Sequence, residues 1–390
     1  MKFIFFANTT WYLYNFRLAT IQRLLGDGHE VLVVSPPGKF GKRLVEHGCR
    51  WIPLAMERAS LNPLRELATL GRLVGVLRRE RPDIVHGFTL KCAIYGTIAA
   101  RIARVPAMVS AVSGMGFVFT SNALKARILR PLVKTLLRFA LHGERSLLVL
   151  QNHDDALAFA QAGLVAPERI RIILGSGVNT FRFHPSNRTT HRYERLRVLL
   201  AARLLQEKGV REFIEAAAIL RQQDRDIEFL LAGTPDPGNP HSISRAELRR
   251  WTEAGLVQCL GHVNDMPALL GSVHVLALPS YYREGVPKSL IEGAATGLAL
   301  ITTNQPGCRE VVTQDGVDGL WVEPRNAQAL AACIARLDDD RDWLAQLGDR
   351  AREQALKKFD ERLVIQQTLE VYAELQGPDS SAAEAMRTAP

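Results

Sequence analysis

Short runs of apolar residues recur along the first half of the chain, and stretches with helical spacing separate them. Apolar runs of this length, bounded by polar residues, are typical of strands that are buried on both faces of a sheet. They predict strands at residues 3–7, 30–34, 83–86, 107–112 and 147–150. Helical spacing predicts helices at residues 18–25, 63–79 and 93–103. This alternation favours β-α units on a parallel sheet.

The second half of the chain repeats this alternation. It predicts strands at residues 197–201, 227–232, 257–260, 274–278, 300–303 and 319–322. Residues 183–195, between the two series, are polar and contain Pro185 and Asn187, so we expect an interdomain linker there. The predicted fold class is therefore α/β, with two doubly wound Rossmann-like domains at residues 1–182 and 196–358.

The last part of the chain changes character twice. Leu363, Leu369 and Tyr372 have helical spacing, which predicts a helix at residues 359–376. Residues 377–390 are small and polar, and we expect this tail to be disordered.

Length and composition agree with two domains. A chain of 390 residues with 47% hydrophobic content can bury two ordinary cores. The first apolar run is too short for a signal sequence, and no run reaches the roughly 18 residues that a spanning helix needs. We therefore expect a cytoplasmic protein. The five scattered cysteines contain no C-x-x-C pair, which argues against a disulfide framework or a zinc site.

The net charge of +9 is unevenly distributed along the chain. Residues 1–170 contain 23 Lys and Arg against 11 Asp and Glu, and the remainder contains 26 against 29. The excess in the first half indicates an anionic partner, for which nucleic acid and an anionic membrane are both candidates. The alternative is a solvated basic surface without a partner.

Residues 122–145 carry the clearest partner signal of the first half. Basic residues recur there every three or four positions, at Arg127, Arg130, Lys134, Arg138 and His142, with leucines and Phe139 between them. This spacing predicts a basic amphipathic helix, possibly bent at Pro131, that suits an anionic bilayer or a lipid diphosphate. Each basic residue near a charged membrane contributes about 1 kcal/mol. The alternative is a core helix with a solvated basic face.

Two glutamates flank a predicted helix start in the second half. The strand at residues 274–278 is followed by a loop with Glu284, and Pro287 can open a helix that carries Glu292 in its second turn. Both carboxylates then point toward a crevice at the carboxyl end of a strand, where ligands bind in α/β sheets. The N–H groups of residues 286–289, at the expected start of this helix, suit a phosphate, and the carboxylates suit sugar or ribose hydroxyls. The alternative is a surface glutamate and an unrelated helix glutamate.

The pattern Glu-Gly-x-Pro-x-Ser-x-x-Glu at residues 284–292 resembles the Glu-x7-Glu element of the retaining GT-B glycosyltransferases of family 4. Residues 302–312 and 316–322 resemble the segments that follow it in that family. The resemblance implies two domains that face each other across a cleft and a last helix that crosses back to the first domain. It also implies that Glu284 contacts the donor sugar and Glu292 the ribose. The neighbouring donor-binding residues it implies are Gly285, Val286, Pro287, Lys288 and Ser289.

A second motif places cations at a strand exit. Arg203 and Lys208 follow the strand at residues 197–201, and such a pair can converge on a pyrophosphate. By composition alone this is a routine βα loop. It resembles the family's Arg-Leu-x-x-x-Lys-Gly element, whose cations stabilise the nucleotide diphosphate as the leaving group. Two further strand exits add Gly233, His262 and Val263 to the donor-binding residues, the last two by resemblance to the loop that faces the base.

The first βα turn, at residues 7–17, lacks the glycine pair that is usual in the family. Its aromatic residues either line the acceptor side or pack under the first helix. His86 ends a strand and can hold a hydroxyl or a phosphate, or is simply structural. Ser113 stands where many family members carry a histidine. With Tyr14 and Arg17, these two residues are the acceptor-side candidates.

Residues 14–17, 58–63 and 113–119 resemble one branch of family 4, which elongates undecaprenyl-diphosphate-linked sugars in capsule, O-antigen and N-glycan assembly. The bacillosaminyl-lipid N-acetylgalactosaminyltransferases belong to this branch. The resemblance implies a retaining transferase that moves an N-acetylhexosamine or hexose from a UDP-sugar onto such a lipid-linked saccharide. Together with the basic stripe of residues 122–145, the lipid-linked acceptor indicates peripheral attachment to the inner face of the plasma membrane, through Arg127, Arg130, Lys134 and Arg138, and no nucleic-acid partner.

No Asp-x-Asp stands in a strand-exit loop, and residues 338–340 form an acidic run in the C-terminal helices, so we expect no metal and no cofactor beyond the nucleotide-sugar. One alternative is a nucleotide-sugar epimerase or phosphorylase of the same fold. The other is a non-catalytic GT-B shell that binds membranes.

Overall fold

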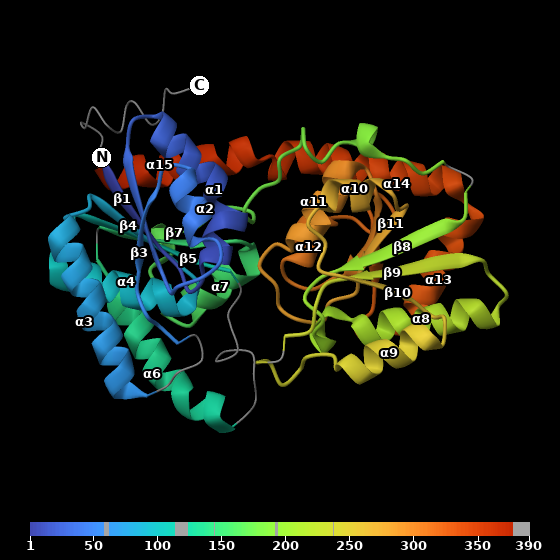
Figure 1. Cartoon of the computed structure of the whole chain (residues 1–390), viewed down its shortest axis with the longest axis horizontal. Helices are drawn as coiled ribbons and strands as arrows, with labels where there is room; N and C mark the ends of the chain where they lie inside the picture. The colour runs from blue at the N-terminus through green and yellow to red at the C-terminus, as the bar shows by residue number, and fades with distance from the viewer. Residues whose placement is uncertain (58–61, 114–123, 144, 192–193, 237, 377–390) are drawn as a thin grey trace. The chain divides into compact units, whose positions relative to one another are not determined.

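The computed structural model describes residues 1–57, 62–113, 124–143, 145–191, 194–236 and 238–376, with the side chains of residues 124–129 excepted. The chain forms two compact units (Figure 1). The first unit contains Met1–Ser176 and the chain from Arg362 onward, and the second contains Gly177–Glu361. The two α/β units agree with the predicted fold class.

A parallel sheet of seven strands in the order β3-β2-β1-β4-β5-β6-β7 forms the centre of the first unit. Its strands are β1 (Lys2–Phe6), β2 (Glu30–Ser35), β3 (Arg50–Pro53), β4 (Ile84–Phe88), β5 (Ala107–Val112), β6 (Ser146–Leu150) and β7 (Ile170–Ile172). The helices are α1 (Thr10–Gly26), α2 (Gly41–Glu46), α3 (Pro63–Glu80), α4 (Leu90–Ala103), α6 (Leu124–Leu141), α7 (His153–Gln161) and α15 (Glu361–Gln376).

The apolar run of β1 is buried on both faces of this sheet. Phe3 and Phe5 belong to a core that also contains residues of α1, α2 and α15. Ile4 and Phe6 belong to a second core that contains residues of α3 and α4. The continuous run at the start of the chain is therefore explained by helices on both sides of the strand.

The prediction of a βα turn at residues 7–17 is wrong from Thr10 onward, where the chain is helical. Helix α1 begins at Thr10, because the side chain of Thr9 accepts a hydrogen bond from the backbone N–H of Tyr12 and caps the helix. The aromatic residues of this stretch thus lie in the first two turns of a helix. Tyr12 and Tyr14 pack against the first core, and Trp11 stays 44% exposed.

The chain returns to the first unit in α15, close to the predicted range 359–376. Tyr372 and Leu369 are fully buried in the core that contains Phe3 and Phe5. Residues 377–390, predicted to form a disordered tail, lie outside the described residues.

The second unit contains a parallel sheet of six strands in the order β10-β9-β8-β11-β12-β13. Its strands are β8 (Leu196–Ala201), β9 (Ile227–Ala232), β10 (Gln258–Gly261), β11 (Val275–Leu278), β12 (Ala299–Thr303) and β13 (Leu320–Val322). Its helices are α8 (Val210–Gln222), α9 (Arg245–Glu253), α10 (Met266–Gly271), α11 (Lys288–Thr296), α12 (Cys308–Val311), α13 (Ala327–Asp339) and α14 (Arg341–Gln354). All six predicted strands of this half are confirmed.

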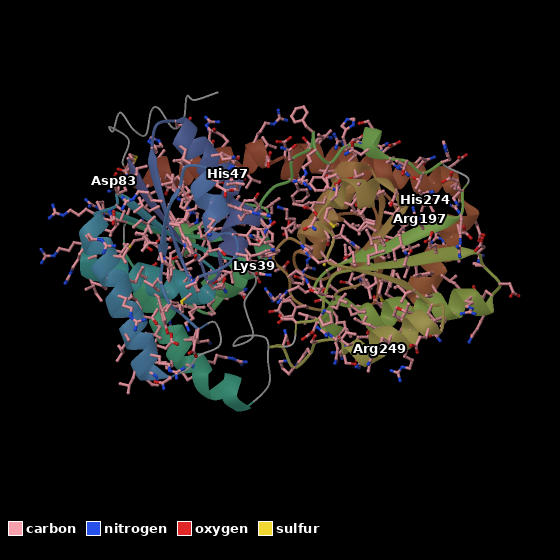
Figure 2. The ribbon with its side chains drawn as sticks, in the orientation of Figure 1. Lys39, His47, Asp83, Arg197, Arg249 and His274 are labelled. Carbon is pink, nitrogen blue, oxygen red and sulfur yellow. The ribbon has the colours of Figure 1, made fainter. Side chains whose placement is uncertain are left out.

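Next to β11, the side chain of His274 has a structural role. Its Nδ1 accepts a hydrogen bond of 3.1 Å from the backbone N–H of Arg197, and burial lowers its pKa. Figure 2 labels both residues. The Nε2 of His274 faces the carbonyl oxygen of His191 at 3.2 Å. This neutral imidazole therefore joins β8 to the start of β11.

The residues predicted as the linker, 183–195, lie inside the second unit, which begins at Gly177. The backbone N–H of Thr189 donates to the carbonyl of Gly271 over 2.8 Å, and Arg188 Nη1 donates to the carbonyl of Gly297 over 3.2 Å. The polar composition predicted an interdomain linker, but these polar groups form hydrogen bonds with backbone carbonyls of the second unit. Within the described residues, no helix is both long and apolar enough to cross a membrane.

Candidate functional site

Glu284 and Glu292 lie on either side of the start of α11. The loop after β11 carries Glu284, and α11 begins at Lys288 with Pro287 as its N-cap, one residue later than predicted. Glu292 occupies the second turn of α11, as predicted. Both glutamates therefore follow the carboxyl end of β11.

The carboxylate of Glu284 forms an ion pair with the ammonium of Lys208, and both side chains are mostly buried, at 12% and 14% exposure. Lys208 lies in the turn after β8, and β8 is the direct neighbour of β11 in the sheet. The two motifs are 76 residues apart in the chain. Strand order therefore joins the predicted sugar-binding carboxylate to the predicted diphosphate-binding lysine in one site.

Ser280 supports this pair and was not among the predicted site residues. It is fully buried, and its hydroxyl lies 2.9 Å from Glu284 Oε1 and 3.0 Å from the carbonyl oxygen of Glu207. The hydroxyl of Thr303, at the end of β12, donates to the carbonyl of Ser280. Ser280 thus holds the Glu284 loop against the turn that carries Lys208. The only sequence signal for this supporting role of Ser280 is its position directly after Pro279, where the strand ends.

Two glycines allow the backbone to approach closely here. Gly209, with φ of +75°, would place a Cβ 2.3 Å from the carbonyl oxygen of Pro279. Gly307, with φ of +82°, would place a Cβ 1.5 Å from the carbonyl oxygen of Gly285. Any side chain at either position would displace the loop that carries Glu284.

The carboxylate of Glu292 is buried, with 8% of the residue exposed. In the part of the chain that the structure describes, no hydrogen bond or ion pair reaches this carboxylate. Burial raises its pKa, and the positive charges of Lys288 and Arg182 oppose this effect. A buried acceptor of this kind suits the hydroxyl groups of a ligand.

Four predicted donor-binding residues lie in the loops that follow β8, β9 and β10: Arg203, Gly233, His262 and Val263. Arg203 is half exposed, and its Nη1 lies 3.3 Å from Asp236 Oδ2, so in the free protein Arg203 pairs with Asp236 whereas Lys208 pairs with Glu284. Gly233 donates its N–H to the carbonyl of Gly261 over 2.7 Å and leaves no room for a Cβ next to Ala202. His262 is exposed and Val263 partly exposed in the loop after β10.

The acceptor-side candidates of the first unit fall into separate places. Arg17 and His86 both contact the ring of Phe88, with the Arg17 guanidinium carbon 4.7 Å from the ring centroid and the His86 ring 4.0 Å away. Tyr14 packs against Phe40 instead, with a centroid distance of 5.0 Å. Ser113 is exposed just after β5.

The predicted basic helix corresponds to α6, which contains Pro131. Arg138 donates to the carbonyls of Gly163 and Ala162, so its charge caps the end of α7 and is not a free member of the basic stripe. Leu132 and Phe139 are each 56% exposed. The side chain of Arg127 lies outside the described residues.

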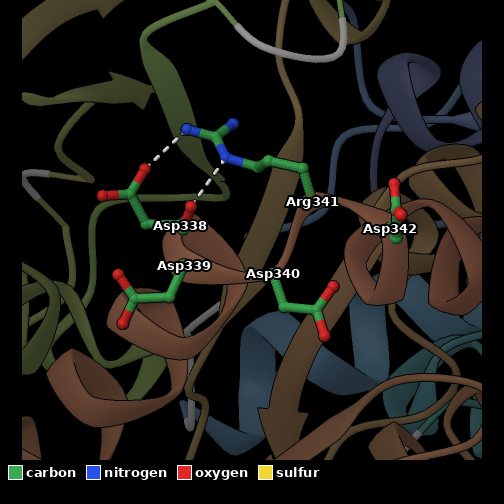
Figure 3. A pocket seen from close by; sticks show the side chains of 5 residues that line it. All are labelled: Asp338, Asp339, Asp340, Arg341 and Asp342. Atoms are coloured by element: carbon green, nitrogen blue, oxygen red, sulfur yellow. Dashed lines mark hydrogen bonds and ion pairs between the residues drawn. The ribbon is translucent and has the colours of Figure 1, made fainter.

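Two carboxylates of the acidic run at the junction of α13 and α14 form ion pairs with arginines. Asp338 binds Arg341 (Figure 3). Asp339 lies 2.7 Å from Arg225. Asp340 caps α14 by accepting from the backbone N–H of Trp343 over 2.8 Å. Throughout the described residues, no group of three or more His, Cys, Asp or Glu side chains could hold a metal ion.

Comparison with known proteins identifies the class of this chain. Residues 195–340 match the glycosyl transferases group 1, and residues 2–147 match the glycosyl transferase 4-like proteins. The structure is similar to that of Anabaena HepE in complex with UDP, with a TM-score of 0.76 and 22% identity over 96% of this chain and 100% of that one. The chain therefore has the GT-B fold and belongs to family 4 of the retaining glycosyltransferases.

Two relatives of known activity are similar over much of their length. One is the N,N'-diacetylbacillosaminyl-diphospho-undecaprenol alpha-1,3-N-acetylgalactosaminyltransferase of Campylobacter jejuni, 29% identical over 95% of this chain and 98% of its own. The other is the UDP-Gal:alpha-D-GlcNAc-diphosphoundecaprenol alpha-1,3-galactosyltransferase of Escherichia coli, 28% identical over 75% of each chain.

Proposed function

We propose that this enzyme transfers a hexose or N-acetylhexosamine from a UDP-sugar to an undecaprenyl-diphosphate-linked saccharide in the assembly of a surface polysaccharide or glycan. The observation that carries the proposal is the Lys208–Glu284 pair at the adjacent exits of β8 and β11. It joins a cation suited to a departing diphosphate with a carboxylate suited to sugar hydroxyls. The Campylobacter and Escherichia coli relatives, which act on undecaprenyl-diphosphate acceptors, support the choice of acceptor.

On the donor side, Lys208 and Arg203 neutralise the charge that develops on the leaving diphosphate. Binding of this group requires Lys208 to exchange part of its interaction with Glu284 for phosphate oxygens. The N–H groups at the start of α11, from Val286 to Ser289, add the positive end of a helix.

The two carboxylates and the loop after β10 complete the donor site. Glu284, released from Lys208 and still held by Ser280, accepts hydrogen bonds from the sugar hydroxyls. Glu292 accepts from the ribose hydroxyls, which satisfies its buried carboxylate. His262 and Val263 face the uracil.

The reaction proceeds without a divalent metal. Two cationic side chains and a helix N-terminus neutralise the negative charge of the leaving diphosphate, as Mg²⁺ does in other enzymes that release a phosphate or diphosphate. In the acceptor unit, Tyr14 and Arg17 lie on α1, which starts after the carboxyl end of β1. His86 lies near the carboxyl end of β4, and Ser113 directly follows β5. The acceptor binds at this edge of the first sheet.

The enzyme acts at the inner face of the plasma membrane, to which α6 attaches it peripherally. Arg130 and Lys134 supply positive charge on α6, and the exposed Leu132 and Phe139 supply apolar area. Such a combination suits an anionic lipid surface.

A screen of radiolabelled nucleotide-sugars against a short-chain polyprenyl-diphosphate sugar tests the proposal. The expected result is label in the lipid-linked product with one or two UDP-sugars. Release of an isomerised nucleotide-sugar without transfer supports an epimerase, and phosphate-dependent release of a sugar phosphate supports a phosphorylase. Absence of UDP binding in the same preparation supports a non-catalytic shell.

A further inference from the structure

Arg17 is a buried cation that has no counter-charge among the described residues. The residue lies in the middle of α1 and is 6% exposed. Its Nη2 donates to the phenol oxygen of Tyr12 over 3.2 Å, and its guanidinium lies over the ring of Phe88. Within the residues that the structure describes, no carboxylate pairs with Arg17, and its Nε is buried without a hydrogen-bond partner. Burying a charge in this way is costly unless an anion compensates it.

His86 packs against the same ring of Phe88 and has a ring nitrogen without a hydrogen-bond partner among the described residues. It is 2% exposed, its ring lies 4.0 Å from that of Phe88, and its Nδ1 lies 2.6 Å from the phenol oxygen of Tyr372. Burial and the charge of Arg17 keep its pKa well below the usual value, so the imidazole is neutral. Burial also raises the pKa of Tyr372, so this phenol keeps its proton and can donate it to Nδ1.

In that tautomer Nε2 of His86 carries the ring proton. This nitrogen is buried and has no hydrogen-bond partner among the described residues. Arg17 and His86 together therefore present two unused N–H donors and one positive charge.

The place of these residues in the sheet is where α/β folds bind ligands. Strands β1 and β4 are neighbours, with β2 and β3 following β1 on one side and β5 to β7 following β4 on the other. The winding of the sheet thus reverses between β1 and β4, and ligands bind outside the carboxyl ends of strands at such a reversal. Arg17 lies on the helix after β1, and His86 is paired with Phe5 two residues before the end of β4.

We propose that Arg17 and His86 form an oxyanion-binding site in the first unit that takes a phosphate or diphosphate group. A guanidinium and a neutral N–H donor match the oxygens of such a group, whereas sugar hydroxyls would leave the charge of Arg17 uncompensated. Two sources of this chemistry exist in the proposed reaction, the lipid diphosphate of the acceptor and the diphosphate of the donor. The assignment of the source rests on the proposed function, whereas the site itself is defined by anion binding and not by turnover.

Titration calorimetry with farnesyl diphosphate, UDP and inorganic pyrophosphate tests the site, with farnesol and uridine as uncharged counterparts. The parent protein is expected to bind at least one phosphate probe saturably. Arg17→Met, which keeps the length of the side chain, is expected to weaken that binding at least tenfold and to leave farnesol and uridine unaffected. Weakening for farnesyl diphosphate alone identifies the acceptor as the source, and weakening for UDP alone identifies the donor.

A matched control is available in the same unit. Arg43 also lies over aromatic rings, 5.3 Å from the centroid of Phe40 and 5.9 Å from that of Tyr14, but it is exposed. Arg43→Met is expected to bind every probe as the parent does. Arg17→Lys, which keeps the charge and loses the planar fork, is expected to fold and to bind the phosphate probe several times more weakly.

Thermal unfolding without any probe provides an independent measurement. Because Arg17→Met removes an uncompensated buried charge, its melting temperature is expected to equal or exceed that of the parent. The proposal is overturned if the parent binds no phosphate probe, or if Arg17→Met and Arg17→Lys both bind all probes as the parent does. It is also overturned if Arg17→Met weakens the charged and uncharged probes equally.

Discussion

The ammonium of Lys208 and the carboxylate of Glu284 neutralise each other in the free protein. Both are largely buried, and a buried pair is stable only while each partner has the other or a substitute. A nucleotide-sugar supplies both substitutes, because its diphosphate is anionic and its sugar carries hydroxyl donors. In the proposed function, donor binding is therefore an exchange of partners in which neither charge is left alone.

Removing the lysine should stop catalysis. Lys208→Ala is expected to lower kcat by about 10²–10³, since the leaving diphosphate loses a charge on the scale of one oxyanion donor. Arg203→Ala should act in the same direction. Steady-state rates with the preferred UDP-sugar measure this, and melting curves check that both variants fold. Arg211→Ala is the control, because Arg211 is a half-exposed arginine on α8 that pairs with Glu247. Unchanged rates in both site variants would remove the diphosphate assignment.

Chelation should leave turnover intact. The proposed charge neutralisation uses Lys208, Arg203 and the start of α11, none of which depends on a divalent ion. Initial rates before and after dialysis against excess EDTA are expected to agree. Loss of activity that Mg²⁺ or Mn²⁺ restores would show that a metal takes part.

Glu292→Gln should weaken UDP binding without weakening the fold. The raised pKa of Glu292 means that folding favours its protonated form, so its contribution to stability is present below the ordinary value of 4.5 and is lost as pH rises through the folded value. The ionised group thus costs stability near neutral pH, and the neutral amide does not.

Melting curves of Glu292→Gln and the parent should therefore coincide in acid and differ in favour of the variant near neutral pH. Titration with UDP should show a lower affinity for the variant. Glu253→Gln, at an exposed position on α9, serves as the control. A lower melting temperature near neutral pH would mean that the carboxylate has a partner that stabilises the fold.

Reversing two charges on α6 should release the protein from membranes. Arg130→Glu with Lys134→Glu is expected to abolish flotation with anionic vesicles at low salt, whereas UDP affinity stays unchanged. Arg138 is left in place because it caps α7. Arg245→Glu with Arg249→Glu, on α9 of the second unit, changes the net charge equally and should still float. Figure 2 labels Arg249. If both double variants float as the parent does, α6 does not attach the protein.

Most strands could be predicted because each contributes a continuous apolar run, and the two that were missed explain the limit. In β3, Arg50 and Pro53 flank only two apolar residues, and β7 consists of Ile170, Arg171 and Ile172. Both are edge strands, paired on one side only, so they lack the continuous apolar run that is typical of a buried strand.

The individual motifs of the site could be predicted, but their contacts could not. Alternating strands and helices imply a parallel sheet and leave the strand order open, and only the adjacency of β8 and β11 brings Lys208 to Glu284. The supporting hydroxyl of Ser280 depends on the same adjacency. Likewise, the start of α1 was missed because the cap at Thr9 is one residue in an aromatic stretch that lacks the usual apolar periodicity.

The return of α15 to the first unit has a consequence for biosynthesis. The second unit is one continuous segment, Gly177–Glu361, whereas the first needs the last helix to cover Phe3 and Phe5. On the ribosome, the N-terminal sheet is made first, and α1 and α2 can pack on it at once, but the part of its apolar face that α15 covers waits until α15 leaves the exit tunnel. The second unit can complete its folding in that interval, which reverses the usual order in which domains fold during synthesis.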